Sequence, residues 1–196
     1  MSSKSEETRI RILQAAWKLL EANRGDGVRM SDIAKQAEVS RQAVYLHFSN
    51  RSDLLTATTL YIDKIKDIDA RLAPSRNAEN GILRLELFID AWGRYISEIY
   101  PVAKALLAMQ DTDEDAAAAW SGRMQALRHG CEAAIKALQK DGHLSSLFSH
   151  KEAVDMLWTI LSIRNWEHLT QDCEWSLKKY LSKTKLLSHQ LFVKQK

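Results

Sequence analysis

The chain has 196 residues, of which 45% are hydrophobic and 27% charged, and its formal net charge is +3. This composition is ordinary for a globular protein, and so small a net charge excludes binding to nucleic acid through overall charge alone. Two cysteines exclude a disulfide framework, and no apolar run is long enough to span a membrane. The polar N-terminus lacks a signal-peptide core, so we expect a cytoplasmic protein that does not associate with membranes.

Apolar residues recur with the helical period along nearly the whole chain, and glycine and proline are few. In the first third, this period predicts a helix over 4–23, two short helices within 31–48 and a long helix over 51–72. Pro74 is expected to end the long helix because its ring and missing N–H do not allow a helix to continue. The polar segment 74–80 is therefore the predicted linker.

The remainder of the chain predicts longer helices, over 80–99, 101–110, 111–140, 149–170 and 174–192. Pro101 is expected in the first turn of its helix, where a missing N–H costs nothing. Ser149 and Glu152 have the spacing of a capping box, which places a helix start there. The sequence thus predicts an all-α protein of about nine helices.

The two short helices within 31–48 are joined by a tight turn, which is typical of a helix-turn-helix. We expect Val39 to fill the turn, Ser40 to cap the second helix, and Val44 and Phe48 to face inward. This leaves an outward face of polar and small side chains, namely Arg41, Gln42, Ala43, Tyr45 and His47. Arginine can pair with guanine, glutamine with adenine and alanine with the thymine methyl group, while tyrosine and histidine can bond phosphates. The alternative is an ordinary helical hairpin with a solvated face.

The runs RILQAAWKLL and RMSDIAKQAEVSRQAVYLHFSNRSDLL closely resemble the DNA-binding region of the TetR (tetracycline-repressor) family, over residues 8 to 56. The resemblance implies a helix-turn-helix domain over 1–50, a connecting helix over 51–73 and an effector-binding and dimerisation domain over 74–196. It also implies DNA-contacting positions. The phosphate contacts are Tyr45, His47 and Arg51; the base-facing positions are Arg41, Gln42 and Ala43; further candidates are Arg29, Ser31 and Ser40.

Several positions depart from the family pattern. Arg29 stands where a serine or threonine usually caps the second helix, so that this cap is lost or moves to Ser31. Glu38 replaces the usual turn glycine, which requires a residue with a side chain to adopt a left-handed conformation. Gln42 and Ala43 replace a frequent Gly-Thr pair, which leaves the recognised DNA sequence open.

The C-terminal two-thirds carries many aromatic side chains. They either fill an all-α core or line a pocket for a flat or cationic hydrophobic effector, with Asp90, Gln125 and His129 as orienting groups. The candidate pocket residues are Trp92, Tyr95, Met109, Trp120, Met124 and Trp158. The acidic run 111–115 is interpreted as a solvated helix start rather than a cation site.

The last two predicted helices carry apolar stripes that suit a four-helix dimer interface, as the resemblance also implies. The candidate interface residues are Leu157, Ile160, Leu161, Arg164, Trp175, Leu177 and Leu181. The alternative is that these stripes pack within the chain. His129 and Cys131 point to different faces of a helix, so we expect no metal site and no cofactor.

Together these patterns predict a homodimeric repressor that leaves a pseudo-palindromic double-stranded DNA operator when a small hydrophobic effector binds. Two alternatives remain, an activator or effector-independent DNA binder of the same fold and an all-α enzyme or carrier. Against an enzyme, the sequence shows no catalytic serine–histidine–aspartate order, phosphate-binding glycine loop or metal-ligand spacing.

Overall fold

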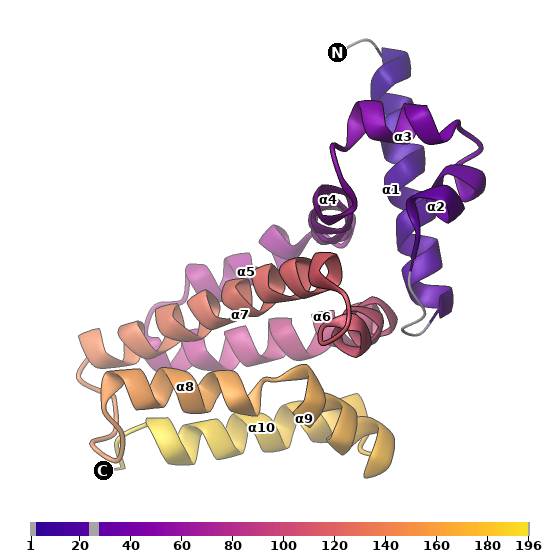
Figure 1. Ribbon diagram of the computed structural model, residues 1–196. Helices are drawn as coiled ribbons and strands as arrows, with labels where there is room; N and C mark the ends of the chain where they lie inside the picture. The colour runs from indigo at the N-terminus through magenta and orange to yellow at the C-terminus, as the bar shows by residue number, and fades with distance from the viewer. Residues whose placement is uncertain (1–2, 24–27, 196) are drawn as a thin grey trace. The chain divides into compact units, whose positions relative to one another are not determined.

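The computed structural model describes residues 3–23 and 28–195 (Figure 1). Over these residues the chain forms ten α-helices and one π-helix, and its β-structure is limited to an isolated bridge between Leu144 and Val193. The all-α prediction is confirmed. None of the helices in these two ranges is long and apolar enough to cross a membrane.

The first five helices are α1 (Ser3–Asn23), α2 (Met30–Gln36), α3 (Arg41–His47), α4 (Arg51–Ile65) and α5 (Ile68–Arg76). The others are α6 (Gly81–Met109), α7 (Glu114–Lys140), α8 (His150–Ile160), α9 (Ile163–Glu167), the π-helix η1 (His168–Asp172) and α10 (Leu177–Phe192).

The helices form two compact units. The first unit holds the chain up to Lys66 together with Ile99–Met124, and the second holds Asp67–Glu98 together with the chain from Gln125 onward. Helices α6 and α7 therefore contribute residues to both units. This division does not follow chain order, whereas the domain limits expected from the sequence do.

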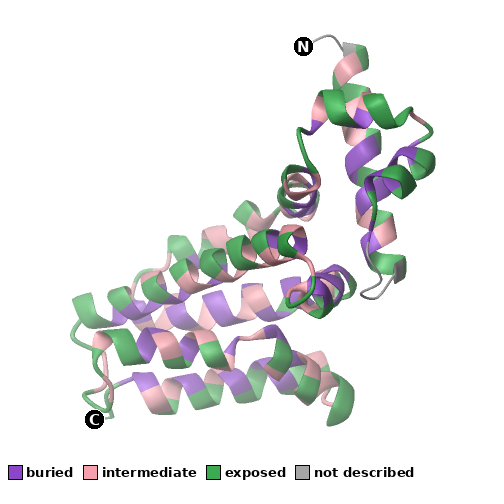
Figure 2. Ribbon diagram, viewed as in Figure 1, coloured by how far each residue is buried: buried purple, intermediate pink, exposed green. Residues whose placement is uncertain are grey.

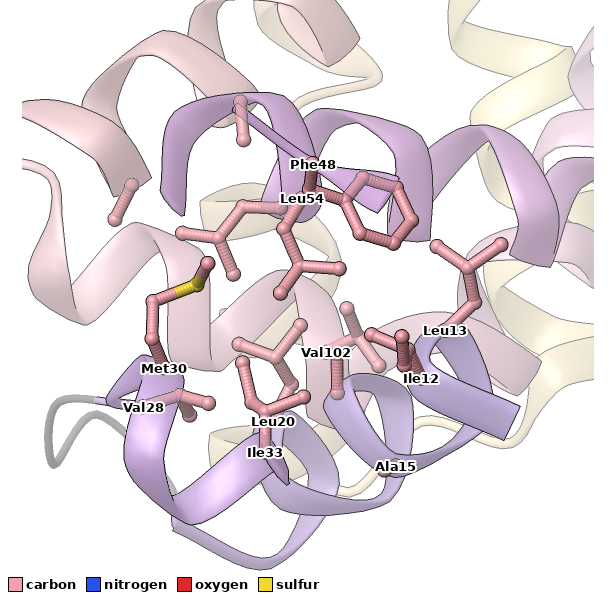
Figure 3. Packing of buried hydrophobic residues seen from close by; sticks show 14 of the residues in the cluster. Ile12, Leu13, Ala15, Leu20, Val28, Met30, Ile33, Phe48, Leu54 and Val102 are labelled. Atoms are coloured by element: carbon pink, nitrogen blue, oxygen red, sulfur yellow. The ribbon is translucent and has the colours of Figure 1, made fainter. Parts of the chain in front are cut away.

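The core of the first unit is a single hydrophobic cluster, part of which is shown in Figure 3. Helix α1 supplies Ile12, Leu13 and Leu20, which recur at the helical spacing and are buried. Residues Val102 of α6 and Ala116 of α7 belong to the same cluster. The fixed position of α1–α4 thus depends on the end of α6 and the start of α7, which lie far away in sequence.

The long helix expected over 51–72 is broken. Helix α4 ends at Ile65, and Asp67 has a left-handed backbone with φ of 52°. The Asp67 carboxylate then accepts a hydrogen bond from the Ala70 N–H at 3.4 Å, so it caps the next helix. Aspartate tolerates the left-handed conformation and can also cap a helix. These two properties explain why α4 ends and α5 begins at this residue.

Neither proline acts as expected. Pro74 lies inside α5, and Pro101 lies inside α6 rather than at the start of a new helix. A proline removes one helical hydrogen bond, but the residues flanking Pro101 bury apolar side chains on both sides, with Ile96 before it and Val102 after it. Burial of the apolar face maintains the helix through the missing bond.

The helix expected over 149–170 begins as predicted, because Ser149 and Glu152 form the complete capping box. It ends at Ile160. Ser162 starts α9 by accepting a hydrogen bond from the Asn165 N–H at 3.2 Å, and the π-helix η1 follows. Arg164 consequently belongs to a different helix from the Leu157 stripe with which it was grouped.

Candidate nucleic-acid interface

The turn between α2 and α3 has the geometry of a helix-turn-helix. Glu38 has φ of 56°, which confirms the left-handed conformation expected where the family has glycine. The Val39 N–H donates to the Ala34 carbonyl at 3.0 Å, which closes the turn. The Ser40 hydroxyl accepts from the Ala43 N–H at 3.1 Å, which confirms Ser40 as the cap of α3.

The start of α2 lacks a side-chain cap, as predicted from Arg29. Arg29 occupies the N-cap position without a side-chain hydrogen bond there, and only its carbonyl accepts from Asp32 and Ile33. Ser31 lies inside α2 rather than at its cap, so the cap has not moved to it. Both side chains are exposed.

One side of α3 packs into the first core. Val44 is fully buried and Phe48 nearly so, and Val39 packs against the same cluster. The Arg9 guanidinium of α1 lies 5.0 Å from the centre of the Phe48 ring. These contacts fix the rotation of α3 about its axis and therefore determine which side chains face outward.

The opposite side of α3 is open, as the exposed stretches of this helix in Figure 2 illustrate. Arg41, Gln42 and Tyr45 are exposed, while Ala43 and His47 are half-buried. Arg41 Nη2 lies 3.4 Å from the Tyr45 hydroxyl, and its guanidinium carbon lies 5.6 Å from the Tyr45 ring centre. The predicted outward face exists, and two of its members are paired with each other.

Leu46 also faces outward, and the sequence reasoning missed it. Its side chain is 80% exposed. It follows the buried Val44 by two residues, which is about 200° around a helix, so the inward assignment of Val44 already implied this position. The outward position of Leu46 was not expected because leucine side chains are usually buried in a core.

Arg51, a predicted phosphate contact, is held inside the first unit. Its Nε donates to the Val28 carbonyl at 2.5 Å, and its Nη1 lies 2.7 Å from an Asp113 carboxylate oxygen and 3.3 Å from one of Asp115. The hydrogen bond from Arg51 lowers the pKa of Asp113 below its ordinary value. The same Asp113 oxygen accepts from the Ala116 N–H at 3.1 Å, which caps α7. Part of the acidic run thus binds an arginine as well as starting a helix.

The predicted pocket residues are divided between the two units. Met109 is buried in the first core and Trp120 packs against it. In the second unit, Trp92 donates from Nε1 to the Leu161 carbonyl at 2.8 Å, and its ring lies 6.3 Å from that of Tyr95. The Arg128 guanidinium lies 5.9 Å from the Trp158 ring.

The polar groups expected beside the pocket differ in their surroundings. Asp90 forms ion pairs with Arg94 at 2.5 Å and with Lys185 at 2.7 Å. Gln125 and His129 are exposed. Met124, the last pocket candidate, is half-buried in the first unit. Asp90 is thus a structural anchor between α6 and α10.

Three leucines of the predicted dimer stripes are covered by the chain itself. Leu157 and Leu161 are fully buried in the second hydrophobic cluster. Leu181 is buried, and its Cδ2 lies 2.5 Å from the position that a Cβ on Gly93 would occupy. Ile160, Trp175 and Leu177 are half-buried and Arg164 is exposed. The large apolar side chains that α8 and α10 do expose are Met156, Leu186 and Leu187.

Among residues 3–23 and 28–195, no three histidine, cysteine or acidic side chains come together as metal ligands. Cys131 is buried and Cys173 is exposed. Burial raises the pKa of the Cys131 thiol. Neither cysteine belongs to the face formed by α3.

The comparison with known families concerns the same helix-turn-helix region. Residues 12–58 match the family model described as bacterial regulatory proteins, tetR family. The helix-turn-helix segment of the chain therefore matches the tetR family. The matched segment runs from α1 into α4 and contains the whole outward face of α3.

The chain is also similar in sequence to individual transcriptional regulators. The chain is 32% identical over 104 residues to the HTH-type transcriptional regulator TtgR of Pseudomonas putida, a match that covers 48% of this chain and 50% of TtgR. The chain spans about half the length of the curated relatives that it matches.

Solved structures of tetR-like fold match nearly the whole chain. NalD of Pseudomonas aeruginosa, the secondary repressor of the MexAB-OprM multidrug efflux pump, aligns with a TM-score of 0.72 at 18% identity, over 98% of this chain and 99% of NalD. FadR of Bacillus subtilis, solved in complex with stearoyl-CoA, aligns with a TM-score of 0.73 at 16% identity, over 91% and 96% of the two chains. At these identities the match establishes the shared fold.

Proposed function

We propose that this protein is a transcriptional regulator that binds double-stranded DNA as a homodimer, and that it acts as a repressor released by a small hydrophobic effector. The observation that carries the proposal is the outward face of α3, held by a capped turn and by the burial of Val44 and Phe48. A rigid helix that projects polar side chains suits the major groove.

Within this face, different side chains have different tasks. Gln42 and Ala43 read base edges, while Tyr45 and His47 hold phosphates. Arg41 stands at the start of the helix and reaches either a base or a phosphate, with its guanidinium steadied by Tyr45. Arg29, Ser31 and Ser40 lie at the adjoining helix starts. Arg51 begins α4, and its ion pairs with Asp113 and Asp115 make its role that of a support for this region.

A binding selection from a random DNA library tests the proposal. We expect the wild type to enrich one pseudo-palindromic sequence, and Gln42→Ala to change the preferred base at one position of each half-site. His47→Ala is expected to weaken binding to every sequence by a similar factor, because a phosphate contact carries no sequence information.

The matched control is Gln139→Ala, which removes an exposed glutamine from α7 in the second unit. It is expected to leave the selected sequence unchanged. For the wild type, binding must also weaken steeply as salt rises, since phosphate contacts release counterions. A wild type that enriches no sequence, or binding that does not respond to salt, would contradict the proposal.

For the homodimer, we propose that the exposed apolar side chains of α8 and α10 form the interface. Exposed apolar residues rimmed by polar ones are typical of association sites. Leu186 and Leu187 are 50% and 44% exposed on α10, where the flanking Lys183 and Gln190 are polar. Met156 is the corresponding exposed residue of α8.

Sedimentation at micromolar concentration tests the interface. We expect a dimer for the wild type and a monomer for the double variant Leu186→Glu, Leu187→Glu. Leu147→Glu is the matched control, because Leu147 is also an exposed leucine but lies in the loop before α8. A wild type that remains a monomer would rule out the dimer.

For the effector, we propose a hydrophobic compound bound in the second unit beside Trp92, Tyr95 and Trp158. Aromatic rings with a few polar atoms are typical walls of a ligand site. The stearoyl-CoA complex of FadR is an instance of a hydrophobic ligand in this fold. Candidate compounds are expected to quench tryptophan fluorescence and to release the selected DNA at the same concentrations, since a ligand acts through its differential affinity for the two states. Quenching without release would favour an effector-independent DNA binder.

A further inference from the structure

The outward side of α3 divides into two rows of side chains. Residues four apart lie on the same face of a helix, so Arg41 and Tyr45 form one row and Gln42 and Leu46 form the other. The first row is internally paired, because Arg41 Nη2 lies 3.4 Å from the Tyr45 hydroxyl. The second row combines an exposed amide with an exposed apolar group.

Leu46 is unusual in its exposure. At 80% it is the most exposed of the large hydrophobic side chains that lie at the surface of the described residues. Its neighbour Val44 is fully buried, so α3 already has the apolar contacts that attach it to the core. Leu46 therefore contributes little to the fold, and its apolar side chain is available for a contact outside the chain.

The chemistry of the DNA major groove limits what Leu46 can contact there. Base edges present hydrogen-bond donors and acceptors, and the one apolar group among them is the C5-methyl of thymine. A leucine cannot pair with the polar groups, and covering them would leave them without partners. Gln42, one turn away in the same row, has the donor and acceptor that match adenine. The row of Gln42 and Leu46 therefore matches an adenine, contacted by Gln42, beside a thymine whose methyl group contacts Leu46.

We propose that Leu46 is a specificity-determining residue that packs against the C5-methyl group of a thymine adjacent to the adenine read by Gln42. The inference rests on the proposed function as a DNA-binding protein. Ala43 is the other apolar residue near this face, but it is half-buried and has only a methyl group. Leu46 extends further from the helix and has the larger surface to cover.

Replacement of thymine by deoxyuridine in the selected DNA tests the inference, because it removes only the C5-methyl group. We expect one thymine in each half-site to respond. Its replacement should weaken wild-type binding about fourfold, which corresponds to the free energy of burying one methyl-sized group. In Leu46→Ala the same replacement is expected to have no effect. Leu46→Met keeps a long apolar side chain, so deoxyuridine is expected to weaken its binding nearly as much as it weakens wild-type binding.

Two controls make the result specific. Leu60→Ala removes an exposed leucine from α4 and is expected to show the wild-type response to deoxyuridine. Ala43→Gly tests the neighbouring apolar residue. The inference is overturned if no thymine in the selected site responds to the replacement. It is also overturned if Leu46→Ala still responds, and loss of the response in Ala43→Gly would then assign the methyl contact to Ala43. A library that enriches no site contradicts the proposed function itself, which is a different result.

Discussion

Arg51 and Asp113, 62 positions apart in the sequence, are joined at 2.7 Å by an ion pair in which both side chains are largely buried. The pair joins the first residue of α4 to the residue that caps α7, and Arg51 Nε also binds the Val28 carbonyl just before α2. One guanidinium thus connects three segments of the first unit. Its partner carboxylate is the more informative one to change, since Asp113 has no proposed contact with DNA.

Asp113→Asn is expected to lower the free energy of unfolding by about 1–2 kcal/mol, because the hydrogen bond from the Arg51 guanidinium loses the negative charge of its acceptor. Urea unfolding at pH 7 measures this. The exposed neighbour Asp111 supplies the control, and Asp111→Asn is expected to change stability by less than about 0.5 kcal/mol.

The same variant has a predicted pH dependence. The hydrogen bond from Arg51 lowers the pKa of Asp113 in the folded chain below its usual value of 3.8. The unfolded chain therefore takes up a proton at higher pH than the folded chain, and the stabilisation is lost as the pH falls through the folded value. The difference between wild type and Asp113→Asn should be constant above the usual value and shrink below it. A difference that grows on acidification would contradict the ion pair.

Glu38→Gly is expected to stabilise the protein by about 0.5–1 kcal/mol, because residues with a Cβ are strained in the left-handed region where Glu38 lies. The comparison is Glu132→Gly in the middle of α7, which is expected to cost about 1 kcal/mol. Thermal unfolding of the two variants should move in opposite directions. Destabilisation by both would argue that the Glu38 side chain has a role outside the turn.

Two helical glycines should respond oppositely to alanine. A Cβ on Gly81 would lie 2.5 Å from the Leu138 backbone nitrogen, so Gly81→Ala is expected to cost about 1–3 kcal/mol through a clash that backbone cannot relieve. A Cβ on Gly122 meets no atom within 4 Å, and Gly122→Ala is expected to gain about 0.5–1 kcal/mol from helix propensity. Denaturant midpoints of the two variants measure both effects. Equal effects would contradict the close approach of α6 to the end of α7.

The two cysteines are expected to differ in reactivity. Cys173 is exposed, whereas Cys131 is buried and has a raised pKa, which keeps it in the unreactive thiol form. A thiol reagent such as Ellman's should therefore titrate about one thiol in the folded protein and about two in urea. Cys173→Ser should show none until it unfolds. Rapid reaction of that variant in the folded state would place Cys131 at the surface.

Much of the helix-turn-helix could be predicted from the sequence because its determinants are local. The cap at Ser40, the left-handed Glu38 and the buried Val44 and Phe48 all depend on residues within a few positions of each other. Such spacing rules are strong for short helices whose two faces differ in polarity. The assignment of the outward face followed directly, apart from Leu46.

The less predictable features depend on contacts between distant segments. The bond between Arg51 and Asp113 follows from packing of the end of α6 and the start of α7 against α1–α4, which periodicity does not report. The stripe containing Leu157 and Leu161 was correctly identified as apolar, but spacing alone does not say whether the chain or a partner covers it. The break at Asp67 depends on a single left-handed residue that is not glycine.

The residues that attach α3 to the core and those that face outward are separate sets. Val44 and Phe48 carry the first task, while Gln42 and Leu46 have no part in it. Substitutions at positions 42 and 46 consequently change the exposed row with little cost in stability. Mutations at these two positions can therefore change which DNA sequence is recognised while the chain still folds. Gln42 already differs from the residue common in the family, and the fold places little constraint on further change at this position.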